Sequence, residues 1–286
     1  MKLDINILKE PADFFASCKK KEIELEKEGL FNHDENDNSI NDADPINENF
    51  PYIKKGFINW IKHLFCLNCV RIYSHLINKK LTNLKVKKNN HLKTIKAAIV
   101  TCNHISLVDS FAIRKAIGAD FYYVAAEFNN FKGHIGTLAR HSGYIPIPED
   151  LNKTKIRKFN EAISYYLKKG KRVLIYPEQS MWREYIKPRP LKNGAFRYAA
   201  QNNVPILPLF ITIKEKEQKI DKNGLANFGD YTIHILDPIY PKSEFNLKEN
   251  VEYLKTENYR VWKELYENVY NIPLEYTTID KSKIKI

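Results

Sequence analysis

The segment TCNHISLVDS, residues 101–110, places a histidine and an aspartate five positions apart, directly after a short apolar run. An imidazole can take a proton from a hydroxyl group near neutral pH, and a carboxylate bound to its other ring nitrogen fixes the tautomer and stabilises the imidazolium. His104 and Asp109 are therefore candidates for a general-base dyad. Such a dyad activates a hydroxyl of the substrate and needs no nucleophile from the protein.

The spacing of the two residues restricts how they can meet. Five residues advance a regular helix by about 500°, which leaves two side chains some 140° apart. The pair can meet only if His104 stays in the turn after the strand and a helix begins near Ser106, so that Asp109 reaches back from the first turn. The alternative is that Ser106 and Asp109 form a capping box and His104 is an ordinary surface residue.

The elements that must position this pair follow from the apolar pattern after Lys96. Short apolar runs alternate with helical patterns, which predicts an α/β fold with a mostly parallel central sheet flanked by helices. The expected strands are 97–102, 121–126, 144–147, 172–176, 205–213 and 231–236. The expected helices are 107–117, one marked by apolar residues from 156 to 167 and ended by Gly170, 194–202 and 247–270. His104 would then lie beyond the carboxyl end of a strand, where sites in such sheets usually form.

Charge and the apolar pattern together divide the 286 residues into three regions. Residues 1–50 hold 6 basic and 13 acidic side chains, whereas 51–286 hold 40 and 21, a net charge of +19. We expect 1–50 to be an acidic segment with a helix over 11–28 and an Asn/Asp-rich solvated linker over 32–50, although a genome biased toward Asn codons explains that composition equally well. The other regions would be a basic helical region over 51–94 and the α/β domain over 95–286.

Residues 54–78 favour one or two amphipathic helices, because Phe, Trp, Leu and Ile side chains recur there at helical spacing. No acidic residue lies between Glu48 and Asp109. Such a region can settle on an anionic membrane surface; the alternative is that its apolar face packs on the domain behind it. No apolar run is long enough to span a bilayer, and neither a signal peptide nor a disulfide framework is evident. We expect a cytoplasmic protein bound peripherally to the inner face of a membrane.

Three further segments follow the dyad: HSGYIPI at 141–147, YPEQS at 176–180 and VPILP at 204–208. Together with NHISLVD at 103–109, which has the pattern NHxxxxD, they resemble the four sequence blocks of the glycerolipid acyltransferases, the family that contains 1-acylglycerol-3-phosphate acyltransferase. The resemblance covers about residues 95–240. One H-x4-D pattern is a weak signal, but four blocks in the family's order and spacing are a strong one.

The resemblance implies an O-acyltransferase of phospholipid biosynthesis. Such an enzyme moves a fatty acyl chain from a coenzyme A or acyl-carrier-protein thioester to the hydroxyl of a lysophospholipid or glycerol phosphate, so the thioester is a substrate and no cofactor or metal is expected. His104 would be the base, Asp109 its orienting partner, and Glu178 a residue that holds the acceptor. Asn103, from the same blocks, is a further candidate for substrate binding. No acyl-enzyme is expected, and the sequence contains no G-x-S-x-G. Backbone N–H groups in the turn after His104 and at the opening of the helix that follows are expected to stabilise the oxyanion.

Two positions depart from the family pattern. The third block usually continues with Gly, Thr and an Arg that contacts the acceptor phosphate, whereas Gln179, Ser180 and Met181 stand here; the second commonly ends in Arg, where Pro148 stands. We expect Gln179 and Ser180 to contact substrate, and a nearby basic cluster to replace the missing arginines, since an Arg fork suits phosphate. The cluster consists of Arg183, Lys187, Arg189 and Lys192. The alternative is a solvated basic loop.

Other functions remain as alternatives. A catalytically inactive lipid-surface protein could share the fold, and a nucleic-acid-binding protein could use the same basic stretch, but aromatic residues at helical spacing suit lipid at least as well, so we expect no nucleic-acid partner. The segment from His63 to His75 contains C-x2-C with flanking histidines, which invites a zinc interpretation, but it lies among bulky apolar residues. Trp182 is most simply a core residue, with lining of the substrate pocket as the alternative.

Overall fold

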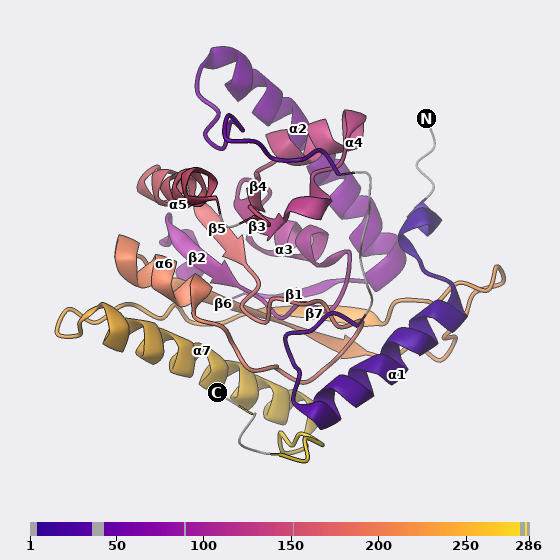
Figure 1. The fold of residues 1–286 in the computed structure, drawn as a ribbon. Helices are drawn as coiled ribbons and strands as arrows, with labels where there is room; N and C mark the ends of the chain where they lie inside the picture. The colour runs from indigo at the N-terminus through magenta and orange to yellow at the C-terminus, as the bar shows by residue number, and fades with distance from the viewer. Residues whose placement is uncertain (1–4, 36–42, 89, 151, 281–283, 285–286) are drawn as a thin grey trace.

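The computed structural model describes residues 5–35, 43–88, 90–150, 152–280 and 284. A seven-stranded sheet lies at its centre, with strand order β1-β7-β6-β2-β5-β3-β4 (Figure 1). The strands are β1 Lys85–Lys87, β2 Ala98–Thr101, β3 Tyr122–Ala126, β4 Tyr144–Ile147, β5 Arg172–Ile175, β6 Ile206–Lys214 and β7 Asp230–Ile235. Neighbouring strands run parallel except β6 and β7, which are antiparallel. The predicted α/β fold with a mostly parallel sheet is confirmed.

Helices cover both faces of the sheet (Figure 1). The α-helices are α1 Ala12–Glu28, α2 Phe57–Ile77, α3 Asp109–Ile117, α4 Gly133–His141, α5 Lys153–Lys168, α6 Gly194–Asn202 and α7 Leu247–Tyr270. Side chains of α5, α6 and α7 share one apolar core with one side of the sheet, whereas those of α2 and α3 share a second core with the other side. Within the described residues, no helix is both long and apolar enough to cross a bilayer.

The central strand β2 determines where the chemistry can lie. All four of its residues are buried, as expected for a parallel strand with neighbours on both sides. Its last residue, Thr101, pairs with Ile175 at the end of β5 and with Pro208 in β6. The turns that follow β2 and β5 therefore leave the sheet side by side, which brings the first and third sequence blocks together.

The described residues of the expected solvated linker over 32–50 are mostly exposed, but two of them are buried, while 36–42 lies outside the described residues. Ile46 is only 2% exposed and belongs to the core, and its backbone N–H donates to Glu127. At the other end, Glu35 is buried and forms an ion pair with Arg183. The composition is polar, but one isoleucine and one paired carboxylate are enough to hold such a stretch against the domain.

The sequence pattern does not predict two of the observed elements, β1 and α4. Strand β1 joins the sheet by pairing with β7, so the sheet begins before the boundary expected at residue 95. Helix α4 has the sequence GHIGTLARH, whose two glycines lower its helix propensity. The glycine at 136 is required by packing, because a Cβ atom there would lie 1.5 Å from the carbonyl oxygen of Phe131. Tertiary contacts therefore decide this helix.

The buried His234 of β7 gives the fold a pH dependence. Burial lowers the pKa of His234 to about 4, and the charge of Lys87 acts in the same direction. Because this pKa lies below the ordinary 6.5, protonation of His234 favours the unfolded chain. The contribution of His234 to the free energy of unfolding is therefore fully present above pH 6.5, and roughly 3 kcal/mol of it is lost as the pH drops to about 4. We expect His234→Gln to remove this part of the pH dependence in urea unfolding measured across that range. An unchanged slope in the variant would contradict the assignment.

Candidate active site

His104 and Asp109 meet in the turn between β2 and α3. Nδ1 of His104 lies 3.0 Å from Oδ2 of Asp109, and the carboxylate is 1% exposed. Burial raises the pKa of Asp109, while the hydrogen bond with His104 opposes that rise. Because an ionised carboxylate can only accept hydrogen bonds, Nδ1 carries the hydrogen, which leaves Nε2 able to take a proton.

The same carboxylate also shapes the turn. Oδ2 of Asp109 accepts hydrogen bonds from the backbone N–H groups of Ile105, at 2.8 Å, and Ser106, at 3.0 Å. Helix α3 begins at Asp109 itself rather than near Ser106, and its N-cap residue, Val108, makes no side-chain capping bond. The capping contact between Asp109 and the backbone of Ser106 is therefore present, and Ser106 Oγ accepts from the backbone N–H of Val108 at 3.2 Å. The other part of that alternative, His104 as an ordinary surface residue, is wrong, because the same carboxylate also holds the imidazole.

His104 lies on the wall of a pocket with a volume of about 590 Å³. Its ring stacks on Tyr176, with ring centroids 4.0 Å apart and an angle of 13° between the planes. Most of the side chains that line the pocket are apolar or aromatic; they include Val124 of β3, Phe159 of α5 and Phe131 in the segment before α4. The dyad therefore opens into a space that suits a hydrocarbon chain.

Glu178 does not line this pocket, contrary to its expected role in holding the acceptor. It is 1% exposed, and its Oε2 accepts hydrogen bonds from the backbone N–H of His104, at 3.0 Å, and from the guanidinium of Arg189, at 2.9 Å. Its Oε1 accepts from the backbone N–H of Arg189 at 2.8 Å. Both oxygens serve protein donors, so Glu178 positions the turn that carries His104.

The two arginines of the expected phosphate cluster are buried in contacts with the protein. The guanidinium of Arg189 donates to Glu178, to Ser180 and to the carbonyl oxygens of Phe31 and His104. That of Arg183 binds two acids from the N-terminal region, Glu10 and Glu35. An Arg fork binds phosphate only with donors that are not already taken. The assignment of these two arginines to a phosphate is therefore corrected.

Three other expected substrate contacts also serve the fold. The amide of Asn103 bonds both backbone groups of Ile211, at 2.8 and 3.0 Å. The hydroxyl of Ser180 contacts Arg189 and the carbonyl of Phe31, and Lys187 forms an ion pair with Glu26 at 2.8 Å. Two of the predicted substrate-binding residues, Gln179 and Lys192, line the pocket.

The expected oxyanion donors also have partners. The backbone N–H of His104 donates to Glu178, and those of Ile105 and Ser106 donate to Asp109. These three groups maintain the turn and cannot all turn toward a reacting carbonyl. The expectation that the N–H groups just after His104 stabilise the oxyanion is therefore not supported by this geometry.

Asp34 is a pocket residue that the sequence does not reveal: it lines the same pocket as His104, Gln179 and Met181, although the residue as a whole is exposed. Partial burial of its carboxyl raises its pKa, while His104 and a hydrogen bond from the backbone of Met181 oppose that rise. It lies in the Asn/Asp-rich stretch, where one more aspartate carries no signal. Trp182 is fully buried against Phe31 and does not line the pocket.

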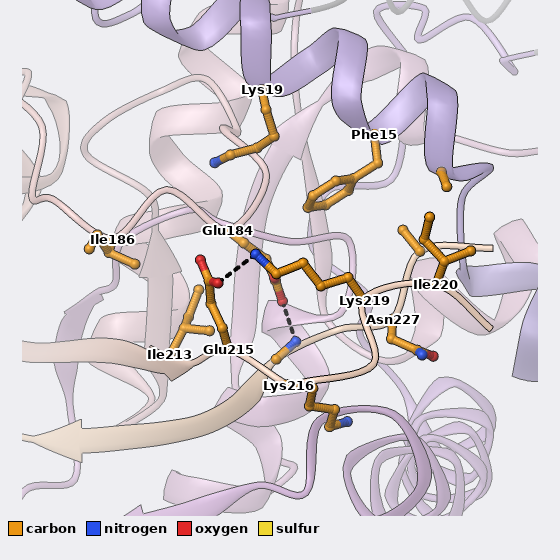
Figure 2. Close-up of a pocket in the computed structure, with 13 residues that line it drawn as sticks. Phe15, Lys19, Glu184, Ile186, Ile213, Glu215, Lys216, Lys219, Ile220 and Asn227 are labelled. Carbon is orange, nitrogen blue, oxygen red and sulfur yellow. Dashed lines mark hydrogen bonds and ion pairs between the residues drawn. The ribbon is translucent and has the colours of Figure 1, made fainter. Parts of the chain in front are cut away.

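A smaller pocket of about 230 Å³ lies between α1 and the segment joining β6 to β7 (Figure 2). Its charged side chains bind other protein groups: Lys219 pairs with Glu215 at 2.8 Å, and Glu184 accepts from the backbone N–H of Gly229 at 2.7 Å. No histidine or cysteine is among the described residues that line it. We therefore place the chemistry in the pocket that holds His104.

The described part of the chain contains no group of three or more His, Cys, Asp or Glu side chains arranged to hold a metal ion. His63, one of the two histidines in the suggested zinc motif, has other partners. Its Nδ1 lies 2.7 Å from the carbonyl oxygen of His141, and its Nε2 lies 3.3 Å from a carboxylate oxygen of Asp120. Cys66 is buried in α2. His63 therefore fastens α2 to the domain.

Comparison with known proteins identifies the region around the dyad. The family model "Acyltransferase" matches residues 83–212. An uncharacterised acyltransferase of Schizosaccharomyces pombe is 29% identical over 159 residues, which are 54% of this chain and 56% of that protein. The 1-acyl-sn-glycerol-3-phosphate acyltransferase of Saccharomyces cerevisiae is 25% identical over 181 residues, 62% of this chain and 59% of that protein. The chain spans about half the length of the curated relatives that it matches.

Among solved structures, the chain resembles the 1-acyl-sn-glycerophosphate acyltransferase PlsC of Thermotoga maritima. The TM-score is 0.55 at 19% identity, over 71% of this chain and 80% of that one. At this identity the likeness concerns the fold, which agrees with the mostly parallel sheet and its flanking helices.

Proposed function

Because the family model "Acyltransferase" matches residues 83–212, we propose that this protein is an O-acyltransferase. It would move a fatty acyl group from a coenzyme A or acyl-carrier-protein thioester to the hydroxyl of a lysophospholipid or a related glycerol phosphate. The observation that carries the proposal is the contact of 3.0 Å between His104 and Asp109 on the wall of an apolar pocket.

The proposed reaction uses three features of the site. The apolar pocket holds the acyl chain, and the acceptor hydroxyl approaches Nε2 of His104. As the hydroxyl oxygen attacks the thioester carbonyl, Nε2 takes its proton, and the Asp109 carboxylate stabilises the resulting imidazolium. The thiol then leaves as the carbonyl re-forms, with the proton on His104 available to the departing sulfur. The thioester is a substrate, and no step requires a cofactor.

A direct assay tests this activity. The purified full chain is incubated with an acyl-CoA or an acyl-carrier-protein thioester and a panel of lysolipids, and both thioester loss and acylated product are measured. The proposal predicts thioester loss that depends on the acceptor. Vesicle binding without any acceptor-dependent transfer would contradict it and would favour the alternative, an inactive lipid-surface protein.

We further propose that α2 lies on a membrane surface. One face of α2 packs into the domain, as the expectation of packing requires. The opposite face leaves bulky apolar side chains from 40% to 72% exposed: Phe57, Ile58, Trp60, Ile61, Leu64, Phe65 and Ile72. Leu107, Ile135 and Ile147, which line the pocket, are also between 42% and 70% exposed. An apolar helix face and an apolar pocket rim suit a lipid substrate that enters from a bilayer.

Charge on this face tests the membrane proposal. We expect the double variant Phe57→Glu and Phe65→Glu to lower the affinity for vesicles containing anionic lipid on the order of 100-fold, because each buried aromatic ring contributes about 1.5–3 kcal/mol. Vesicle flotation at fixed ionic strength measures the effect. The control is Val269→Glu and Ile272→Glu at the end of α7, a helix that lies far from α2 in Figure 1. Equal losses in both double variants would contradict a specific role for α2.

A further inference from the structure

The N-terminal region brings a carboxyl group to the pocket that holds His104. Asp34 follows helix α1 in sequence and lines the same pocket as His104, Gln179 and Lys192. Its neighbours hold this stretch in place: the carbonyl oxygen of His33 accepts from the indole of Trp182 at 2.8 Å, and Glu35 pairs with Arg183. These two contacts hold the backbone on both sides of Asp34, whose exposed side chain lies on the pocket wall.

Positive charge nearby is mostly neutralised. Arg183 binds Glu10 and Glu35, and Arg189 binds Glu178. The charged side chains that line the pocket within the described residues are thus the carboxylate of Asp34 and the ammonium of Lys192, together with the titratable imidazole of His104. A phosphate monoester, which carries close to two negative charges at neutral pH, finds one cation there and one repelling anion.

We infer that Asp34 determines the specificity for the acyl acceptor, favouring a zwitterionic phosphodiester–ammonium head group over a phosphate monoester. One carboxylate and one ammonium in the pocket complement one ammonium and one phosphodiester in the ligand. The carboxylate at the same time repels a doubly charged phosphate. This inference rests on the proposed acyltransferase function and deepens it.

The test compares two acceptors with the same acyl chain, lysophosphatidylethanolamine and lysophosphatidic acid, at low mole fraction in micelles of a neutral detergent. Wild type should show the higher kcat/KM with lysophosphatidylethanolamine. Asp34→Asn should shift the ratio of the two kcat/KM values toward lysophosphatidic acid by roughly 10-fold, because it removes one like charge at short range. Asp34→Lys should shift the ratio further in the same direction.

The matched control is Glu24→Gln, which changes the net charge by the same amount on the same N-terminal region. Glu24 is 48% exposed on α1 and pairs only with Lys21 among the ion pairs of the described residues. Its variant should leave the ratio unchanged within twofold. A preference of wild type for lysophosphatidic acid, an unchanged ratio in both Asp34 variants, or an equal shift in Glu24→Gln would overturn the inference. If wild type acylates neither acceptor but acylates another of the panel, the inference about Asp34 is overturned and the proposed function stands; if it acylates none of the panel, the proposed function itself is contradicted.

Discussion

Replacing His104 by alanine should lower kcat/KM for acyl transfer about 10²–10⁴-fold, the usual cost of losing a general base. The reason is geometric: the imidazole contacts Asp109, at 3.0 Å, and lines the proposed substrate pocket, where Nε2 can meet a hydroxyl. Unfolding of the variant is measured in parallel, because the ring also stacks on Tyr176 and contacts the buried Asp109, and the rate is referred to folded protein. Rates of acceptor-dependent thioester loss, measured with any acceptor that wild type uses, check the prediction.

Two further variants make this experiment decisive. His134→Ala removes an exposed histidine of α4 that does not line the pocket, and it should keep the wild-type rate. Asp109→Asn keeps the shape of the carboxylate but removes its charge, so the imidazolium formed during the reaction is less stabilised and the rate should fall. Retention of most activity in His104→Ala would refute the dyad, whatever the other variants do.

Glu178→Gln should lower the free energy of unfolding by about 3 kcal/mol, because it leaves the Arg189 guanidinium charged and buried without its counter-ion. Both side chains are 1% exposed, and Glu178 also accepts the backbone N–H groups of His104 and Arg189. Urea unfolding followed by circular dichroism gives the change. The remaining folded protein should also show a lower kcat, since the turn that carries His104 loses an acceptor.

The ion pair of Arg157 and Glu161 on α5 supplies the control. Its side chains are 61% and 53% exposed, and an exposed pair at this spacing contributes less than about 1 kcal/mol. Glu161→Gln should therefore hardly move the unfolding midpoint. If both variants lower the unfolding midpoint by the same small amount, Glu178 does not stabilise the segments of His104 and Arg189 that it contacts.

The fold class could be predicted from the sequence, which left the dyad as one of two alternatives for His104 and Asp109. Short apolar runs such as that around β2 indicate buried strands. Helices α6 and α7 begin and end at the residues that the spacing of apolar side chains predicts. His104 and Asp109 were predictable for a related reason: they are separated by five positions, so local backbone geometry alone decides whether they can meet.

The tertiary structure decided which polar residues face the substrate. Arg183 and Glu35 lie 148 positions apart, and no local pattern relates them, yet their contact removes Arg183 from the expected phosphate site. Asp34 enters the pocket through the same packing of the N-terminal region. A charge is available to a ligand only if no other part of the chain neutralises it, and that depends on contacts between distant segments rather than on residue type or spacing.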